Sequence, residues 1–363
     1  MPHFKKNTTS TTHRLKTLCL AAILTLATSA CHTPHPTDNQ TTHTTYQYTD
    51  DYGSIVDVPT HPQRIVSLSP AVTEIIFALG ADSLLVGRTD FCNYPPQAQH
   101  IESIGGISNL NIEKVLSCKP DLIISGSMVP QKIVQQFAKM NIPLVCVIEK
   151  QKFDGLFTNV QSIGRLIGKE HTADSLNASM RKHLKTLVNP DTIHPHPTPQ
   201  TLKPSNPQTH STHSTPQTLK PSNPQTHPTH PTHSPTNTLT HSHTNAFPPS
   251  PTVYYVVGFG PDGNFTAGGN TFINDIIQMA GGHNIAAHSQ GWTFSLEALI
   301  NADPDFILIR ANDSARFCNT PPYNQLSAVK NNRTIALEDG ILDLQVPRNI
   351  EVIKQLQKRF ATK

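Results

Sequence analysis

The sequence has few charged residues, a single tryptophan and no long apolar run. Charged residues make up only 15% of the 363 residues and hydrophobic residues 36%, whereas an average globular protein has about 25% charged residues. The net charge of +3 excludes a polybasic nucleic-acid binder, which needs clustered lysine and arginine. No apolar run reaches the ~18 residues of a membrane span, so a polytopic membrane protein is also excluded.

Catalytic motifs are missing as well. The sequence has no G-x-S-x-G nucleophile elbow and no H-E-x-x-H zinc motif, so we do not expect an enzyme. Gly258–Gly263 fits the pattern G-x-G-x-x-G after an apolar run, but a dinucleotide site requires its last glycine to open a helix. Here residues 264–270 intervene and residues 261–263 form a turn, so we reject that interpretation.

The N-terminus is organised like a secretory signal peptide. Basic residues precede a short apolar run at about residues 18–27, and small residues follow it. We therefore predict a signal peptide over residues 1–30 and an exported protein. The break before Cys31 resembles a bacterial lipobox, although Thr28 stands where a leucine-like residue is usual. We favour lipidation of Cys31 at the periplasmic face of the cell membrane, with an ordinary exported cysteine as the alternative.

Removal of the signal peptide changes the charge balance. It takes away four basic residues and no acidic one, which leaves a nearly neutral mature chain with a net charge of −1. Four cysteines then remain besides Cys31, and an oxidising compartment permits three pairings among them. The sequence does not choose between these pairings, and we expect one structural disulfide at most among Cys92, Cys118, Cys146 and Cys318.

Most of the excess histidine and proline lies in one repetitive segment. Residues 191–250 contain nine of the 20 histidines, and the unit at 198–210 recurs at 215–227. Large apolar side chains are almost absent, so burial cannot offset the entropy cost of ordering the segment. We interpret residues 191–250 as a disordered or polyproline-like insertion.

Three histidines in the insertion raise the question of a metal site. His227, His230 and His233 recur every third residue with prolines between them, which forbids a helix. On a polyproline helix with three residues per turn, their imidazoles would align on one side. Weak binding of zinc, nickel or copper and a simple spacer both stay open.

The rest of the chain alternates strand and helix patterns. This alternation predicts an α/β fold with mostly parallel sheets. We expect strands at residues 64–68, 84–87, 121–125, 143–148, 253–257, 305–309 and 334–337. We expect helices at residues 70–79, 112–117, 129–140, 155–187 with a break near Gly168, 271–280, 296–300 and 348–360.

Two lobes of similar size follow from this pattern. The segment at 111–124 is echoed at 295–308: each has a capped short helix, a Pro-Asp break and an apolar strand. The two lobes should therefore share one architecture. The predicted parts are a polar tether at 31–46, an N-terminal lobe at 47–165, an interdomain helix at 166–190 and a C-terminal lobe at 251–363.

Several ordered motifs are similar to those of one known family. In chain order they are RIVSLSPAVTEIIFALG, VGRTDFCNYPPQA, SIGGISNLNIEKVLSCKPDLII and TAGGNTFINDIIQMAGGHNIA. They resemble the class III solute-binding proteins of bacterial ABC importers, whose domain is often called the Fe/B12 periplasmic-binding fold. The resemblance covers most of 54–187 and 252–360 and is nearest in pattern to cobalamin-binding members.

The resemblance implies a fold and a function. The fold has two α/β lobes joined by a long helix, with the ligand in the cleft between them. The ligand would be cobalamin, haem or a ferric siderophore, delivered to a membrane permease and its ATPase. We expect a monomer without bound nucleic acid, which meets the membrane only through its lipid anchor.

Glu113 and Glu297 are the candidate docking residues. In the family, one glutamate on each lobe is similar in position and pairs with arginine on the transporter. Two exposed carboxylates, one per lobe, can read docking orientation through charge-assisted hydrogen bonds. The alternative is that each carboxylate only stabilises the first turn of its helix.

Aromatic side chains at the ends of strands are the candidate ligand contacts. Ligands in such folds meet loops at the carboxyl ends of the strands, and flat aromatic faces suit a large macrocycle. The predicted ligand-binding residues are Phe91, Tyr94, Trp292, Phe317, Tyr323 and Arg348. The TDFCNYPPQA loop and Trp292 favour cobalamin or another corrinoid. The alternative is packing in the core for each aromatic residue and simple solvation at the surface for Arg348.

Two alternatives stay open. A haem or chelated-iron ligand could be coordinated axially by His283, His288 or Tyr94. Alternatively, the protein is an extracytoplasmic metal buffer or metallochaperone that acts through the insertion at 191–250. Deletion of that insertion would leave ligand uptake intact in a binding protein and abolish the function of a metal buffer.

Overall fold

The computed structural model describes residues 44–106, 110–188, 250–289 and 291–362. The described residues from Thr45 onward form one compact unit. None of the helices in these described ranges is long and apolar enough to cross a membrane. The predicted signal peptide, Cys31 and the insertion with His227, His230 and His233 lie outside the described residues.

The first sheet contains four parallel strands in the order β4-β3-β5-β6. Its central strands are short apolar runs buried on both faces, as expected of a parallel sheet covered by helices. The strands are β3 (Ile65–Ser67), β4 (Leu85–Arg88), β5 (Leu122–Ser125) and β6 (Leu144–Cys146). The helices are α2 (Pro70–Ala78), η1 (Asp82–Leu84), η2 (Pro96–His100), α3 (Ile112–Ser117), α4 (Gln131–Lys139) and α5 (Gly155–Leu166).

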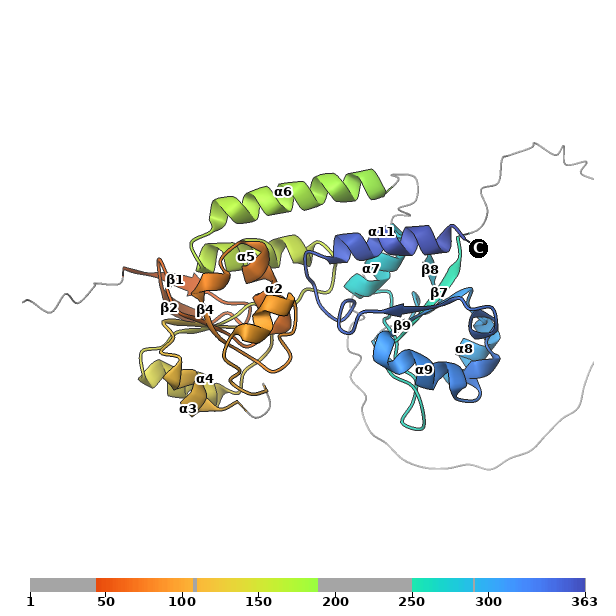
Figure 1. Cartoon of the computed structure of the whole chain (residues 1–363), viewed down its shortest axis with the longest axis horizontal. Helices are drawn as coiled ribbons and strands as arrows, with labels where there is room; N and C mark the ends of the chain where they lie inside the picture. Colours follow the sequence, from red (N-terminus) through yellow and green to blue (C-terminus); the bar gives the residue numbers. More distant parts are fainter. Residues whose placement is uncertain (1–43, 107–109, 189–249, 290, 363) are drawn as a thin grey trace, which may run out of the picture. The chain divides into compact units, whose positions relative to one another are not determined.

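The second sheet also contains four parallel strands, in the order β10-β9-β7-β8. The strands are β7 (Thr252–Val256), β8 (His283–Asn284), β9 (Phe306–Arg310) and β10 (Thr334–Leu337). The helices are α7 (Phe272–Met279), α8 (Leu296–Ala302), α9 (Ala311–Asn319), η4 (Tyr323–Gln325), α10 (Ser327–Lys330) and α11 (Asn349–Phe360). Helices cover both faces of each sheet (Figure 1). The predicted α/β fold with mostly parallel sheets is confirmed.

The two sheets share one topology. Numbered along the chain, the strands of each sheet lie in the order 2-1-3-4. The repeated segment occupies the same place in both, and Lys119 and Asp303 follow the short helix in the left-handed conformation, with φ of 47° and 37°. The predicted similarity of the two halves therefore extends to their backbone.

An aspartate at the same position of each repeat ties the third strand to the first. Asp121 accepts hydrogen bonds from the backbone N–H groups of Gln63 and Arg64, at 2.7 and 3.0 Å. Asp305 accepts hydrogen bonds from the N–H and the hydroxyl of Thr252, at 2.8 and 3.0 Å. The Pro-Asp pair in each repeat thus aligns the two central strands of its sheet.

A short hairpin was not predicted. β1 (Thr45–Thr49) pairs with β2 (Ile55–Pro59) in antiparallel register, and β1 begins inside the segment that we expected to be tether. The Asp50 carboxylate accepts the N–H groups of Tyr52 and Ser54 in the turn, at 3.0 and 2.8 Å. Only one face of β1 packs on the core, so its sequence TYQYT is polar and contains no apolar run that would predict a strand.

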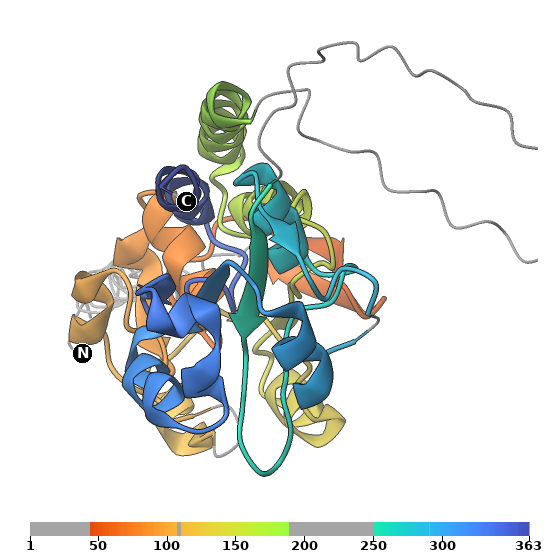
Figure 2. The same cartoon turned by 90° about the vertical axis from the view of Figure 1, so that its right-hand side faces the viewer.

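The predicted helical region at 155–187 divides into two helices, α5 and α6 (Glu170–Leu187). The break falls at Gly168, where φ is +69°. α6 lies beside α5 and α11 (Figures 1 and 2). The Gln357 amide of α11 donates to the carbonyl of Leu187 at 2.7 Å. That α6 is the long interdomain helix of the family stays a prediction.

Candidate functional site

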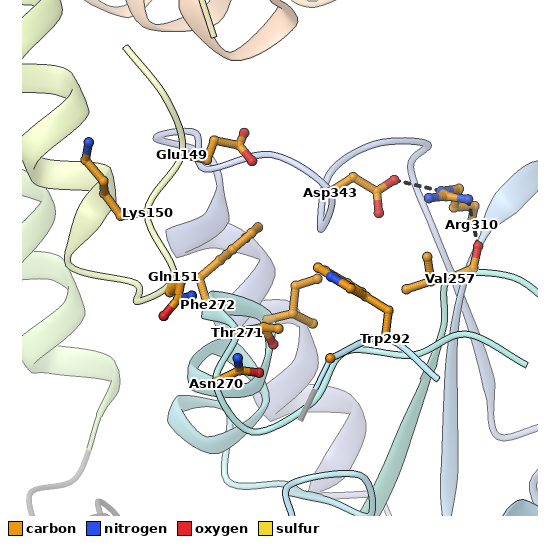
Figure 3. A pocket seen from close by; sticks show the side chains of 12 residues that line it. Glu149, Lys150, Gln151, Val257, Asn270, Thr271, Phe272, Trp292, Arg310 and Asp343 are labelled. Carbon is orange, nitrogen blue, oxygen red and sulfur yellow. Dashed lines mark hydrogen bonds and ion pairs between the residues drawn. The ribbon is translucent and has the colours of Figure 1, made fainter. Parts of the chain in front are cut away.

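A cavity lies at the carboxyl ends of the two central strands of the second sheet (Figure 3). Val257 directly follows β7, Arg310 ends β9, and both line a cavity of about 480 Å³. Strand order reverses between these two strands, which is where open α/β sheets bind ligands. Small-molecule pockets occupy roughly 300–1,000 Å³, so the size suits a ligand or part of one. We call this space the Trp292 cavity.

Two aromatic side chains line the Trp292 cavity. Trp292 is 48% exposed and Phe272 at the start of α7 is buried. The backbone of Trp292 is anchored, because its carbonyl accepts the N–H of Thr266 at 2.7 Å. Trp292 was predicted to contact the ligand, and the structure places it in the wall of this cavity. An indole held at the mouth of a cavity offers a flat apolar face to a ligand.

Arg310 is fixed by two hydrogen-bond partners in the wall of the cavity. Its Nε donates to an Asp343 oxygen at 2.7 Å, and its Nη1 donates to the carbonyl of Val257 at 3.1 Å. The other Asp343 oxygen accepts the Tyr255 hydroxyl at 2.7 Å. Burial raises the pKa of Tyr255, so its hydroxyl stays protonated and donates. Asp343 thus orients the guanidinium and balances its charge.

The opposite wall is the segment that follows β6. The side-chain oxygen of Gln345 accepts the N–H of Lys150 at 2.8 Å, and its amide donates to the carbonyls of Lys150 and Lys152 at 2.8 and 2.9 Å. Gln345 is only 1% exposed. Every polar atom of this buried side chain therefore holds the segment in place, as buried amides require.

Glu149 belongs to the same segment and lines the cavity. One of its carboxylate oxygens accepts the backbone N–H of Gln345 at 3.0 Å. Burial raises the pKa of Glu149 to about 7; the Gln345 N–H lowers it and the nearby Asp343 carboxylate raises it further. This carboxyl is consequently partly protonated near neutral pH.

A second cavity, of about 270 Å³, brings together Tyr94 and Arg348. The Arg348 guanidinium lies 3.9 Å from the centre of the Tyr94 ring, a cation–π contact. Arg348 also pairs with the buried Glu74 at 2.9 Å and with the exposed Glu338 at 2.8 Å. Burial raises the pKa of Glu74 to about 7, although Arg348 opposes the shift. We call this space the Tyr94 cavity.

The other predicted ligand contacts lie elsewhere. Phe91 is 66% exposed and lines neither of these two cavities. Phe317 and Tyr323 are 0% and 2% exposed and pack in the core of the second sheet, so the structure moves them from the predicted site to the interior. Their ring centroids are 4.8 Å apart, and the Tyr323 hydroxyl donates to Asn264 at 2.6 Å.

Local structure explains this correction. The segment around Phe317 was expected to be a loop like that around Phe91, but residues 311–319 form α9. A helix directs one face inward, and Phe317 lies on the inward face of α9. The matching letters Phe-Cys-Asn before the prolines therefore do not mark equivalent positions.

Glu113 and Glu297 occupy the same position in the first turn of α3 and α8. Each helix is capped by a side chain two residues earlier: Asn111 accepts the N–H of Lys114 and Ser295 that of Ala298, both at 3.0 Å. Both glutamates are exposed. Within the described ranges neither carboxylate belongs to an ion pair, so both are available to a partner.

The remaining candidates do not assemble into a metal site. Among the described residues, no three histidine, cysteine or acidic side chains are grouped so that they could hold a metal ion. The four cysteines expected to form at most one disulfide are all free: Cys92, Cys118, Cys146 and Cys318. Burial raises the pKa of Cys146 to about 11, which makes its thiol unreactive.

Among the residues that were not predicted are Glu149, Arg310 and Asp343, which line the Trp292 cavity, and Gln345, which holds one of its walls in place. Arg310 carries a recognisable signal, since it ends an apolar strand and polar groups at that edge commonly meet ligands. The other three lie in irregular segments with no periodicity, so only tertiary structure brings them together.

The comparisons with known proteins agree with this arrangement. Residues 65–190 match the family model described as periplasmic binding protein. An uncharacterised ABC transporter substrate-binding lipoprotein of Bacillus subtilis is 25% identical over 306 residues, covering 83% of this chain and 81% of the relative. A cobalamin-binding protein of Halobacterium salinarum is 24% identical over 326 residues, covering 86% and 73%.

Solved structures share the fold. A periplasmic haem-binding protein from Pseudomonas aeruginosa superposes with a TM-score of 0.61 at 22% identity, covering 83% of this chain and 94% of that protein. At this identity the likeness concerns the fold and not the ligand. The relatives are solute-binding proteins rather than enzymes.

Proposed function

Since this chain belongs to the class III (Fe/B12-type) periplasmic solute-binding proteins, we propose that it captures a metal-chelate nutrient and delivers it to the permease and ATPase of an ABC importer. Cobalamin or another corrinoid is the favoured ligand. Haem and ferric siderophores, carried by proteins of the same fold, are the alternatives. The protein acts as a monomer and performs no catalysis.

The Trp292 cavity is the observation that carries the proposal. It combines a half-exposed indole with fixed polar groups at the reversal point of a parallel sheet. Ligand sites in proteins are mostly apolar with a few placed polar groups, and this cavity has that composition. The relative from Halobacterium salinarum named as a cobalamin-binding protein supports the corrinoid preference.

Tyr94, Arg348 and Phe91 are proposed as further ligand contacts. Tyr94 and Phe91 are 38% and 66% exposed, on the chain that follows β4 of the first sheet. In the structure Arg348 covers one face of the Tyr94 ring. A ligand that stacks on Tyr94 would use its other face or displace the guanidinium.

Docking and export complete the proposal. Glu113 and Glu297 would pair with arginines of the permease, one from each repeat, which sets the orientation of the complex. Cys31, which lies outside the described residues, would carry the lipid after removal of the signal peptide. The relative from Bacillus subtilis, named as a lipoprotein, supports this part.

Absorbance titration tests the ligand. The purified mature protein would be titrated with cyanocobalamin, haemin and a ferric hydroxamate siderophore. We expect saturable changes in the corrin bands, and an affinity about tenfold lower for Trp292→Ala, because stacking area and its exclusion of water are lost. Tyr52→Ala is the control, since Tyr52 is an exposed aromatic residue of the hairpin.

The titration separates the alternatives. A Soret shift with haemin and no response to cobalamin would replace the corrinoid by haem. Equal affinities of wild type and Trp292→Ala would remove the Trp292 cavity from the site. Absence of binding to all three probes would contradict the proposed function.

A further inference from the structure

The two cationic side chains that line the Trp292 cavity are both held in ion pairs. Its lining contains two cations, Lys150 and Arg310, and two carboxyls, Glu149 and Asp343. The cations are both paired: Arg310 with Asp343 at 2.7 Å, and Lys150 with Asp51 at 2.5 Å. In Figure 3 the Lys150 side chain extends away from the other labelled side chains. Among the described lining residues, no cation is therefore left unpaired to bind an incoming anion.

Glu149 adds negative charge to the same space. Gln345 donates one hydrogen bond to it, and Asp343 faces it from the segment before α11. Lys150 follows it in the chain but is paired with Asp51, and Arg310 of β9 is paired with Asp343. Because its pKa is raised to about 7, Glu149 is neutral in mild acid and becomes an anion as the pH rises above 7.

The uncharged lining groups complete the chemistry. Gln151, Asn270 and Thr271 line the cavity beside Trp292 and Phe272. Primary amides both donate and accept hydrogen bonds, and so does a protonated carboxyl. Such a lining matches neutral amide groups around an apolar ring. A carboxylate placed here would face the Glu149 anion above pH 7. Because Asp343 already neutralises Arg310 and Asp51 already pairs with Lys150, no free cation among the described lining residues would compensate this repulsion.

We infer that Glu149 and Asp343 determine specificity, by favouring a chelate whose edge carries uncharged amides and rejecting one whose edge carries carboxylates. The inference rests on the proposed function and chooses among its ligand classes. Corrinoids with amide side chains fit the rule, whereas haem, with its two propionates, does not. The selectivity comes from repulsion of the wrong ligand as much as from attraction of the right one.

A matched pair of ligands tests this inference. Dicyanocobinamide and dicyanocobyrinic acid share the corrin ring and the cobalt, but their side chains are mainly amides in the first and carboxylic acids in the second. We expect the wild-type protein at pH 8 to bind the amide ligand at least about tenfold more tightly. The ratio of the two affinities should be smaller at pH 6, where Glu149 is mostly protonated.

Two variants assign the preference to the named carboxyls. Glu149→Gln keeps the shape and the oxygen that accepts the Gln345 N–H; we expect it to bind the carboxylate ligand several-fold more tightly at pH 8, with little change at pH 6. Asp343→Asn leaves Arg310 uncompensated and should improve binding of the carboxylate ligand at both pH values. Glu102→Gln, which removes an exposed carboxylate elsewhere, should change neither affinity.

The outcomes distinguish this inference from the proposed function. Three results would each overturn the inference: equal affinity for the two corrinoids, a preference for the carboxylate ligand, or a Glu149→Gln variant in which the ratio of the two affinities is the same as in the wild type. Corrinoid binding itself would still support the proposed function. Failure of the wild-type protein to bind either corrinoid, haemin or the siderophore would overturn both.

Discussion

The first and second sheets have the same strand order but differ where their central strands end. In the first sheet Ser69 lies so close to Gly126 that a Cβ added to this glycine would be 2.3 Å from the serine Oγ. In the second sheet Val257 and Arg310 line an open cavity at the equivalent place. Topology thus provides two equivalent positions, and side chains decide which one can receive a ligand.

The repeated helix–turn–strand segments, unlike the strand ends, have the same features in both halves. Glu113 and Glu297, Asp121 and Asp305, and the two helix caps have the same roles in both halves. One difference follows the helix, where the residue with positive φ is Lys119 in the first segment and Asp303 in the second. Structural and proposed docking functions are therefore duplicated, whereas the open cavity belongs to one sheet.

The largest expected effect concerns the duplicated glutamates. Reversing both charges, Glu113→Arg with Glu297→Arg, should abolish transport, because each arginine would then face an arginine of the permease. Ligand affinity should stay unchanged, since neither side chain lines the Trp292 cavity or the Tyr94 cavity. Uptake by cells or proteoliposomes and a parallel binding titration measure the two effects. Unchanged uptake by the double variant would refute docking by these residues.

The next effect concerns how the free energy of unfolding changes with pH, and it compares Glu149 of the Trp292 cavity with Glu74, the buried partner of Arg348. The pKa of Glu149 and of Glu74 is raised from 4.5 to about 7 in the folded protein. Because both pKa values are raised, the contribution of each group to the free energy of unfolding is complete below pH 4.5. This contribution decreases as the pH rises through about 7, by at most about 3 kcal/mol for each group. Urea unfolding of the mature protein at pH 5, 6, 7 and 8 measures this decrease.

Variants separate the two carboxyls. Glu149→Gln should make the decrease with pH smaller, because one of the two titrating groups is gone. Glu74→Gln should reduce the decrease in the same way, because it removes the other titrating carboxyl, and the double variant should remove most of it. A Glu149→Gln variant with the same pH dependence as wild type would show that this carboxyl does not titrate in the expected range. Glu102→Gln is the control.

A smaller effect compares the aspartates that align the central strands. Asp121→Ala and Asp305→Ala each remove hydrogen bonds from a charged acceptor to the adjacent strand, and each should lower the free energy of unfolding by about 2 kcal/mol. Asp154→Ala is the matched control, because its exposed ion pair with Arg181 spans 3.7 Å. Urea denaturation would show unequal losses if the two repeats are not equivalent.

The smallest effect concerns the residues after the short helices. Lys119→Gly should stabilise the protein by about 0.5–1 kcal/mol, because glycine adopts a positive φ without steric cost. Asp303→Gly should not, since Asp303 accepts hydrogen bonds from the N–H and hydroxyl of Ser327, at 2.8 and 2.5 Å. Thermal unfolding measures both. A destabilised Lys119→Gly variant would contradict the assigned role of backbone strain.

Most of the fold could be predicted from the sequence, because its strands are continuous apolar runs and its helices have clear caps. The predicted bounds 112–117 and 334–337 coincide with α3 and β10. The hairpin β1–β2 escaped prediction because β1 (TYQYT) is polar and β2 (IVDVP) is interrupted by an aspartate, so neither strand is a continuous apolar run. α9 was not predicted, because its residues follow the end of an apolar strand, where ligand-binding loops are expected in such folds.

The site was less predictable than the fold. Trp292, Tyr94 and Arg348 line cavities, but they divide between two cavities rather than one, and their contact with a ligand stays a prediction. Phe317 and Tyr323 are core residues, and an aromatic side chain near a strand end does not reveal whether it points inward. Gln345 and Asp343 carry no local signal, because their role depends on segments almost 200 residues away or on a neighbouring strand.

The sequence by itself predicted export, and it determined the two related α/β halves and the matching positions of Glu113 and Glu297. These depend on local patterns: an apolar run after basic residues, alternating strand and helix periods, and a repeated capped helix. Only the tertiary structure decided which strand ends are open, and that the cations of the Trp292 cavity are already paired. Charge balance in a cavity depends on distances between residues that are remote in the chain, so no local pattern could predict it.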